Sequence, residues 1–226
     1  MIPFYHSLSP DAISGSELDF LLAHGWYRMH QAIFTSSHLH LEESYRVHWL
    51  RYPLAEIKNR PSHKRIRNRA KDFHYSIEEL DAIRPDHEAL YATYRESIDF
   101  DGAYSIHQSL FGDEDTEKNL YKTKCISVYD QDRLIAGGYF DVGATSAASI
   151  LHFFDPLYKD YSLGKYLMLL TVDFLQSSGY EFYYPGYLVA GKDKMNYKLF
   201  IGKEATQYFD PETISWKHFQ ESILLE

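Results

Sequence analysis

The sequence predicts an α+β fold in which helices flank a mixed sheet, with a smaller α/β subdomain at the N-terminus. Two observations predict it. Three strand-like segments follow one another over residues 118–154, and an amphipathic segment at 163–177 then leads into a further short apolar run. The length of 226 residues, 45% of them hydrophobic, suits one large domain or two small ones. We predict two parts, residues 1–75 and residues 76–226.

The first part is predicted to begin with a helix near Ser16 to His24, because Gly25 can take the left-handed conformation that ends a helix. Strands are predicted at 27–34 and 45–52, where β-branched and aromatic residues are frequent. A basic segment that starts at Lys58 closes this part of the chain.

The second part is predicted to open with a helix at Ser76, because Ser76-Ile77-Glu78-Glu79 has the pattern of a capping box. A second helix is predicted over 86–98, with Leu90, Tyr94 and Ile98 on one face. An acidic loop is expected at 111–115 before the first strand.

The core of the second part is predicted to be a meander of strands at 118–129, 134–142 and 148–154, since turn-forming residues separate these segments. The amphipathic segment 163–177 is predicted to be a helix, followed by a buried strand at 182–187. A last helix is expected to start at Lys192, which would place Lys194 and Lys198 on one face because they are four residues apart.

Composition excludes several classes of protein. No segment approaches the apolar length of a membrane span, and the N-terminus lacks the basic-then-apolar order of a signal peptide, so we expect a cytoplasmic location. Cys125 is the single cysteine, which rules out internal disulfides and fits a reducing compartment. Its surroundings predict a buried strand position rather than a nucleophile.

One basic segment stands out in an otherwise acidic chain of net charge -9. It holds seven Lys and Arg residues and no acid: Lys58, Arg60, Lys64, Arg65, Arg67, Arg69 and Lys71. If Pro61 opens a helix, Lys64, Arg67 and Lys71 share one face and Arg65 and Arg69 line the next. A nucleic-acid backbone would bind such a stripe, and a solvated surface helix explains it equally well on residues alone.

The motif with the most chemical content lies near the C-terminus. Tyr183-Tyr184-Pro185-Gly186-Tyr187 predicts a strand end, and Lys194-Met195-Asn196-Tyr197-Lys198 follows it closely. Ligands of α/β sheets usually bind beyond the carboxyl ends of strands, and two ammonium groups there suit a ligand that carries phosphate. The alternative is an amphipathic helix with solvated lysines.

These two segments resemble the signature of the aminoacyl-tRNA-protein transferases of the N-end rule pathway, the arginyl- and bacterial leucyl-transferring enzymes. Three further segments agree with that family in order. They are Phe153-Phe154-Asp155-Pro156 with Tyr161-Ser162-Leu163-Gly164-Lys165-Tyr166, the basic Arg60-Pro61-Ser62-His63-Lys64-Arg65, and the early His24-Gly25-Trp26-Tyr27-Arg28. The resemblance therefore spans most of the chain and is more specific in its C-terminal half.

The chain also departs from the family pattern. Where the family carries a cysteine cluster, Thr35-Ser36-Ser37-His38-Leu39-His40-Leu41-Glu42-Glu43 has no cysteine. His38, His40 and Glu42 alternate along a strand and could bind a metal, but an exposed strand edge also explains them, and we predict no metal. The Arg-Pro pair that follows the lysine motif in the family is replaced by Ile201-Gly202-Lys203-Glu204.

The predicted order of three antiparallel strands, a helix and another strand is that of the GNAT acyltransferase fold, which the resembled family also uses. A CoA-dependent GNAT N-acyltransferase is therefore the alternative enzyme. Its pyrophosphate loop would correspond to residues 161–166, where Gly164 alone fits the Gln/Arg-x-x-Gly-x-Gly/Ala pattern. A catalytically silent relative that binds tRNA or a degron is a third possibility.

The resemblance implies the transfer of an amino acid, arginine or leucine, from aminoacyl-tRNA to the N-terminal α-amino group of an acceptor protein. Aminoacyl-tRNA is then the co-substrate and no other cofactor is expected, because the ester is already activated. Its catalytic tasks are to orient the substrates, remove a proton from the amine and stabilise an oxyanion.

His152 and Asp155 are our candidates for the group that takes the amine proton, and Tyr184 or Tyr187 for a contact to the oxyanion or leaving group. Each also has a structural explanation, as a core histidine, a capping carboxylate or packing tyrosines. Lys194 and Lys198 are predicted to contact the tRNA 3′ end, and the basic segment the acceptor stem. The predicted tRNA-binding residues are Lys64, Arg65, Arg67, Arg69, Ser162, Gly164, Lys194, Tyr197 and Lys198.

Overall fold

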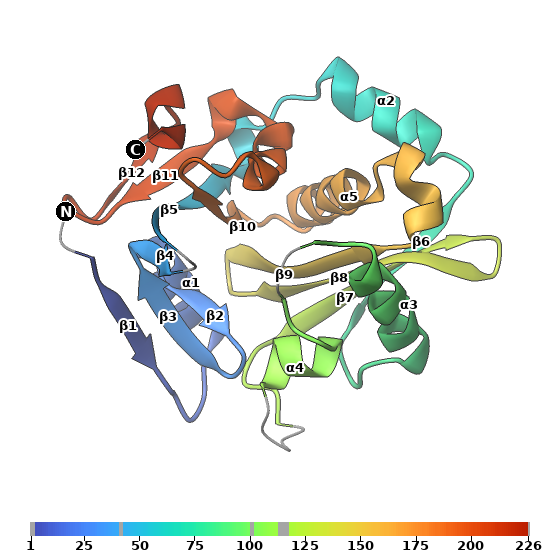
Figure 1. The fold of residues 1–226 in the computed structure, drawn as a ribbon, viewed down its shortest axis with the longest axis horizontal. Helices are drawn as coiled ribbons and strands as arrows, with labels where there is room; N and C mark the ends of the chain where they lie inside the picture. Colours follow the sequence, from blue (N-terminus) through green and yellow to red (C-terminus); the bar gives the residue numbers. More distant parts are fainter. Residues whose placement is uncertain (1–2, 41–42, 100–101, 113–117, 226) are drawn as a thin grey trace.

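The computed structural model describes residues 3–40, 43–99, 102–112 and 118–225, which form two sheets with helices around the larger one (Figure 1). The strands of the larger sheet are β4 (His38–His40), β5 (Ser44–Pro53), β6 (His74–Glu79), β7 (Thr123–Asp130), β8 (Arg133–Val142), β9 (Ser146–Phe154), β10 (Phe182–Val189), β11 (Gln207–Asp210) and β12 (Ser215–His218). Their spatial order is β12-β11-β5-β10-β9-β8-β7-β6, and β4 pairs with β5 off this path. The predicted α+β class with a mixed sheet is confirmed, because β9 and β10 run parallel in an otherwise antiparallel sheet.

The described residues include the predicted helices around 16–24, 86–98 and 163–177, a helix that Pro61 opens, and a short helix over 106–111 that was not predicted. These helices are α1 (Gly15–Ala23), α2 (Pro61–Arg69), α3 (Pro85–Glu96), α4 (Ile106–Phe111) and α5 (Leu163–Ser177). Short 3-10 helices connect other elements: η1 (Leu54–Glu56), η2 (Pro156–Tyr161), η3 (Asp193–Ile201), η4 (Lys203–Ala205) and η5 (Glu221–Leu224). The predictions for α1, α3 and α5 are confirmed, whereas residues 113–117 of the expected acidic loop lie outside the described residues.

Two helical layers cover the two faces of the β7-β8-β9 meander (Figure 1). Successive residues on these strands point to opposite faces, so Ile126 and Phe140 pack in the cluster of α5 while Cys125 and Tyr139 pack in the cluster of α3 and α4. Burial on both faces explains why these strands do not alternate apolar residues with exposed polar ones. It also confirms that Cys125 is a buried strand residue.

The helix predicted at Ser76 is wrong. Residues 74–79 form β6, whose six residues all pair with β7. The capping-box pattern is a local signal worth about 1 kcal/mol, and pairing with a neighbouring strand outweighs it because Ile77 also packs against the α5 cluster. The helix begins instead at Pro85, whose fixed φ suits the first helical position.

The N-terminal part contributes to both sheets. The smaller sheet has the order β1-β3-β2 and contains β1 (Tyr5–Leu8), β2 (Tyr27–Met29) and β3 (Ala32–Ser36). The single strand predicted at 27–34 is therefore a hairpin, because His30 turns the chain with φ 55°. By contrast, β5 pairs with β10 on one side and β11 on the other, so the larger sheet runs across the division expected at residue 75.

A buried ion pair joins the small sheet to the large one. Arg28 Nη1 of β2 lies 2.9 Å from Asp141 Oδ1 of β8, and Arg28 Nη2 donates to the carbonyl oxygen of Leu110 in α4. Thr123 also donates its hydroxyl to Asp141. This network positions the N-terminal hairpin against the end of the meander.

The helix predicted from Lys192 is corrected to the 3-10 helix η3. A 3-10 helix has 3.0 residues per turn, so residues four apart are separated by about 120° rather than lying on one face. Lys194 and Lys198 consequently point in different directions.

Within the described part of the chain, no helix is both long enough and apolar enough to cross a membrane.

Candidate functional site

The parallel strands β9 and β10 separate after a short stretch of pairing. Their register covers three positions, from Phe182↔Ser146 to Tyr184↔Ala148. Beyond them β9 continues along β8 to Phe154, whereas β10 continues along β5 with an irregularity between Tyr183 and Gly186. The second half of β9 is therefore left without β10 as a neighbour, and side chains of η3 reach this opening.

Lys198 of η3 is the ionisable group that this opening encloses. It is 8% exposed, and its Nζ lies 5.4 Å from the ring centroid of Tyr187 and 5.1 Å from that of Tyr197. The Nζ donates to Met195 Sδ at 3.4 Å, and no carboxylate of a described residue pairs with it. Burial therefore lowers the pKa of Lys198 to about 8.

Two backbone features hold Lys198 in place. Gly186 has φ 100°, a conformation that favours glycine, and a Cβ there would lie 3.4 Å from Lys198 Cε. On the other side, the hydroxyl of Tyr52 donates to the carbonyl oxygen of Lys198. The bulge in β10 thus makes room for the lysine stem, while β5 fixes its main chain.

His152 of β9 borders the same enclosure. Its imidazole occupies the space above Gly138 of β8, because a Cβ at that glycine would lie 2.7 Å from His152 Cδ2. Ser149 Oγ lies 3.5 Å from His152 Nε2. Burial, reinforced by the charge of Lys198, lowers the pKa of His152 to about 4, so the imidazole is neutral at pH 7.

The tyrosines of the motif divide between two faces of β10. Tyr187 contributes its ring to the surroundings of Lys198, and Tyr183 packs parallel to Tyr52 at 6.4 Å with a buried hydroxyl that lacks a hydrogen-bond partner in the described residues. Tyr184 lies on the other face from Tyr183, where it packs against Tyr27 and Trp216, and the Tyr187 ring reaches the same aromatic cluster by packing edge-to-face on Trp49. These contacts favour the packing explanation for Tyr184.

Lys194 lies outside the enclosure. Its side chain is 66% exposed, and its Nζ pairs with Asp99 Oδ1 at 2.6 Å. The prediction that Lys194 and Lys198 lie on one face is therefore wrong, because η3 has the 3-10 repeat rather than the α-helical one. The two lysines differ in charge environment: one is solvated and paired, the other buried and without a carboxylate.

Asp155 is also held away from Lys198 by its own contacts. It accepts a hydrogen bond from Leu157 N at 2.9 Å as the cap of η2, and its Oδ2 pairs with Arg133 Nη2 at 2.5 Å. It lines a shallow groove between α3 and the end of β9. This geometry favours the capping explanation over a role in proton transfer.

The basic helix α2 presents part of the predicted stripe. Lys64, Arg65 and Arg69 are exposed, and Arg69 Nη1 donates to the carbonyl oxygen of Asp160. Arg67 is different, because its guanidinium binds Asp173 of α5 at 2.7 Å. Lys71 lies beyond the end of the helix, and Arg67 anchors the helix to α5. The predicted face of Lys64, Arg67 and Lys71 is therefore corrected to an exposed row that consists of Lys64, Arg65 and Arg69.

The start of α5 is open to close approach. Ser162 precedes the helix with φ 56° and makes no side-chain capping bond. A Cβ at Gly164 would lie 3.5 Å from Phe154 Cε1, an ordinary van der Waals contact, so internal packing does not require glycine there. The missing side chain at Gly164 instead leaves space that a ligand could fill.

The alternating polar residues near β4 offer little to a metal. His38 Nδ1 lies 2.8 Å from Ser37 Oγ, and Glu42 lies outside the described residues. No group of three His, Cys, Asp or Glu side chains gathers as a metal site in the residues with described positions. The expectation about a metal stays a prediction.

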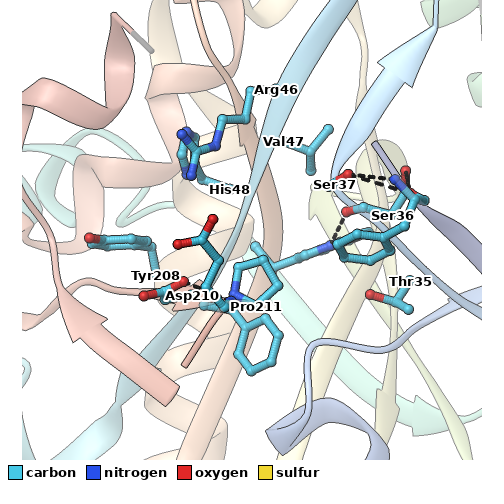
Figure 2. Close-up of a pocket in the computed structure, with 13 residues that line it drawn as sticks. Thr35, Ser36, Ser37, Arg46, Val47, His48, Tyr208, Asp210 and Pro211 are labelled. Atoms are coloured by element: carbon cyan, nitrogen blue, oxygen red, sulfur yellow. Dashed lines mark hydrogen bonds between the residues drawn. The ribbon is translucent and has the colours of Figure 1, made fainter. Parts of the chain in front are cut away.

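A second enclosed site, which the sequence analysis did not predict, lies at the edge of β5. Pairing with β4 ends at Arg46 and pairing with β11 begins at Leu50, and a pocket of about 100 Å³ occupies this gap. Figure 2 shows Arg46 and His48 on one side of it and Ser36 and Ser37 on the other. No sequence pattern signals such a pocket, because it depends on where two edge strands stop.

His48 is the buried group of this pocket. It is 2% exposed and its Nε2 has no partner within the described residues. Burial and the charge of Arg46 lower its pKa to about 4. The sheet order places β5 and β10 between this pocket and the opening that holds Lys198.

Comparisons with known proteins identify relatives of this chain. The sequence model described as "Arginine-tRNA-protein transferase, C terminus" matches residues 86–206, more than half of the chain. Arginyl-tRNA-protein transferase 1 of Saccharomyces cerevisiae is 32% identical over 95 residues, which cover 42% of this chain and 19% of the yeast protein. An aspartate/glutamate leucyltransferase of Aeromonas salmonicida is 30% identical over 160 residues, 69% of this chain and 63% of that protein. The chain thus spans less than two thirds of either relative.

Solved structures show more distant likenesses. The C-terminal domain of a putative lysylphosphatidylglycerol synthetase from Agrobacterium fabrum aligns with a TM-score of 0.47 and 13% identity, covering 71% of this chain and 53% of that chain. FemX aligns with a TM-score of 0.45 and 10% identity, covering 88% of this chain and 68% of its own. Both likenesses are too remote to inform the site.

The matched region contains the elements that enclose Lys198. Strands β9 and β10, helix α5 and η3 all lie within residues 86–206, whereas α2 and β5 precede them. The sequence match and the site thus fall on the same part of the molecule. Because the match extends over more than half of its residues, the chain belongs to the arginine-tRNA-protein transferase family.

Proposed function

We propose that this protein transfers an amino acid, arginine or leucine, from aminoacyl-tRNA to the N-terminal α-amino group of an acceptor protein. The observation that carries the proposal is the buried ammonium of Lys198, which has no carboxylate partner among the described residues and lies in the opening between β9 and β10. A buried charge without a partner is costly, so such a group is expected to meet an anionic ligand. Family membership and the names of the two relatives support this substrate class.

The proposed reaction exchanges an ester for an amide. The acceptor nitrogen attacks the ester carbonyl, the carbon-oxygen bond to the tRNA 3′ ribose breaks, and a proton passes from nitrogen to the departing oxygen. The ester supplies the activation, so aminoacyl-tRNA is the co-substrate and we propose no further cofactor. The protein contributes orientation, charge stabilisation and proton transfer.

We assign the 3′ end of the tRNA to the opening around Lys198. The ammonium can donate to the 3′ oxygens, and the rings of Tyr187 and Tyr197 border it. Ser162 and Gly164 at the start of α5 allow the tRNA backbone to approach closely. His152 lines the opposite wall as a neutral polar group.

We assign the acceptor stem to the exposed row on α2. Lys64 and Arg65 make no ion pair with a described residue, so a phosphate would not have to displace a carboxylate from them. Helix α2 packs against α5 through Arg67 and Asp173, which connects this surface to the helix that begins beside the opening.

We also propose a GNAT-like fold and a cytoplasmic location. The antiparallel β7-β8-β9 meander, the connecting α5 and the parallel β10 follow the order expected for a GNAT acyltransferase. The N-terminal residues up to about 75 would form the smaller subdomain. Charged tRNA and the buried thiol of Cys125 both suit the cytoplasm.

A transfer assay with labelled Arg-tRNA and Leu-tRNA and peptides beginning with Asp, Glu, Lys or Arg tests the function. Lys198→Met should lower transfer by a factor of at least about 10 to 100, because it removes at minimum one or two charge-assisted hydrogen bonds. Lys194→Met is the matched control and should retain nearly full transfer, because Lys194 is exposed and paired with Asp99. Equal losses in both variants, or no transfer together with saturable binding of acetyl-CoA, would contradict the proposal.

A further inference from the structure

The surroundings of Lys198 differ from those of an ordinary binding lysine. The main chain is fixed by Tyr52, the side chain passes Gly186, and the Nζ ends between two aromatic rings and a thioether. None of these groups can take a proton from the ammonium, and no carboxylate of a described residue stabilises it. The enclosure therefore does little to keep the amine charged.

Other groups that face this enclosure are poorly suited to accept a proton. The titratable or charged side chains around it are His152 from β9, Tyr183 and Tyr187 from β10, Tyr197 from η3 and Tyr94 from α3. Burial raises the pKa of Tyr183 and Tyr187, so both stay protonated. Asp155 and Lys194 are held elsewhere by Arg133 and Asp99.

Building on the proposed function, we infer that Lys198 is a catalytic proton carrier: its neutral amine accepts the proton that the acceptor nitrogen loses on attack, and its ammonium then gives that proton to the departing 3′ oxygen. This role adds a chemical step to the contact with the tRNA 3′ end assigned above.

The step balances without a further reactant. The acceptor nitrogen forms a bond to the carbonyl carbon, and Lys198 Nζ removes one proton from that nitrogen in the tetrahedral intermediate. When the carbon-oxygen bond breaks, its electron pair goes to the ribose oxygen, which takes the proton from Lys198. The products are an amide and a free 3′ hydroxyl, and the lysine amine is neutral again.

The proton affinities match this path. With a pKa of about 8, Lys198 is present partly as the neutral amine near neutral pH, so it can accept a proton and return it. His152, with a pKa of about 4, holds a proton much more weakly. Proton transfer is efficient when donor and acceptor are matched near the working pH, so Lys198 is better suited than the histidine.

Lys198→Arg separates a proton carrier from a fixed positive charge, because arginine keeps the charge and does not deprotonate in proteins. We expect Lys198→Arg to lower kcat by a factor on the order of 10² to 10⁴, the usual contribution of general acid-base catalysis, with a much smaller change in KM for the tRNA. Lys194→Arg is the matched control, because Lys194 lies outside the enclosure and pairs with Asp99, so the same exchange there should leave kcat and its pH dependence at wild-type values. Wild-type activity in Lys198→Arg would overturn the inference while leaving the transferase function in place.

A chemical rescue gives a second, independent readout. Lys198→Cys in a Cys125→Ala background has a single thiol, and its alkylation with 2-bromoethylamine restores an amine of similar length but lower basicity. We expect the alkylated protein to regain transfer and to show the acid limb of its kcat/KM profile at lower pH than wild type. Rescue with an unshifted profile would overturn the proton-carrier role. Absence of transfer by wild type with every charged tRNA would overturn the proposed function and, with it, this inference.

Discussion

At the scale of single residues, two glycines shape the opening that holds Lys198. Gly186 permits the bulge in β10 with φ 100°, and Gly138 leaves the space that the His152 imidazole fills. Neither role is visible from the glycines themselves, because each depends on how a side chain from the next element packs against the glycine. Both positions therefore offer tests that change the shape of the opening without replacing an ionisable residue.

Gly138→Ala should displace His152, because the new Cβ would lie 2.7 Å from Cδ2 of the imidazole. We expect the free energy of unfolding to fall by about 1 to 3 kcal/mol, the usual cost of overpacking, and transfer to fall with it. Urea denaturation measures the first effect. Gly164→Ala is the control, because its Cβ would make an ordinary contact of 3.5 Å and alanine is favoured over glycine in a helix. A similar loss of stability in Gly164→Ala would contradict the explanation by overpacking against His152.

Buried histidines should make the protein sensitive to mild acid. Burial lowers the pKa of His48, His87 and His152 to about 4, below the ordinary value near 6.5. The unfolded chain therefore binds these protons first, so stability is complete above about pH 6.5 and is lost as the pH falls toward 4, by up to about 3 kcal/mol for each histidine. Urea denaturation between pH 4 and 7, with the histidine titrations followed by NMR, measures this slope; constant stability across that range would contradict it.

At the scale of elements, most helices and strands follow local patterns, and the exceptions have tertiary causes. The helix over 163–177 and the meander were predicted because their periodicity matches the burial that the structure shows. β6 was predicted as a helix because a capping pattern is local, whereas the β7 edge that it pairs with is not. η3 was predicted as an α-helix because spacing alone does not distinguish 3.6 from 3.0 residues per turn.

Helix α2 should bind tRNA through its exposed row rather than through all its basic residues. Neutralising Lys64 and Arg65 together to Gln should weaken tRNA binding and reduce the salt dependence of log K by about 1 to 2, roughly one unit for each lost phosphate contact. Filter binding over a range of salt concentrations measures this. Arg67→Gln is the control: its guanidinium binds Asp173, so we expect tRNA affinity close to wild type and a loss of stability of about 1 kcal/mol or less. Unchanged affinity in the double variant would contradict the assignment.

At the scale of the whole molecule, the N-terminal residues are part of the architecture that positions the site. β5 supplies Tyr52, which fixes Lys198, and also forms one wall of the pocket in Figure 2. The Arg28-Asp141 pair attaches the N-terminal hairpin to the other end of the sheet. The predicted division at residue 75 stays a prediction, and the pairing of β5 with β10 joins the two parts in one sheet.

Arg28→Gln should destabilise the molecule strongly. It would leave the Asp141 carboxylate buried without its cation, and breaking a buried pair usually costs about 3 to 5 kcal/mol. The melting temperature and the urea midpoint measure the loss. Arg84→Gln is the matched control, because its pair with Asp86 is exposed and should be worth about 1 kcal/mol or less. Equal effects of the two substitutions would show that the Arg28-Asp141 pair contributes no more to stability than a surface ion pair.

The sequence by itself determined the order of the main elements, the basic segment and the motif that contains Lys198, because periodicity, turn residues and charge runs are local properties. Only the tertiary structure decided which of the two motif lysines is buried and which is exposed. Exposure of Lys194 and burial of Lys198 depend on how η3 meets the opening between β9 and β10, and on a glycine in a third segment that makes room for the side chain. The low dielectric of that enclosure lowers the pKa of Lys198, which an exposed lysine at the same place in the sequence would not show.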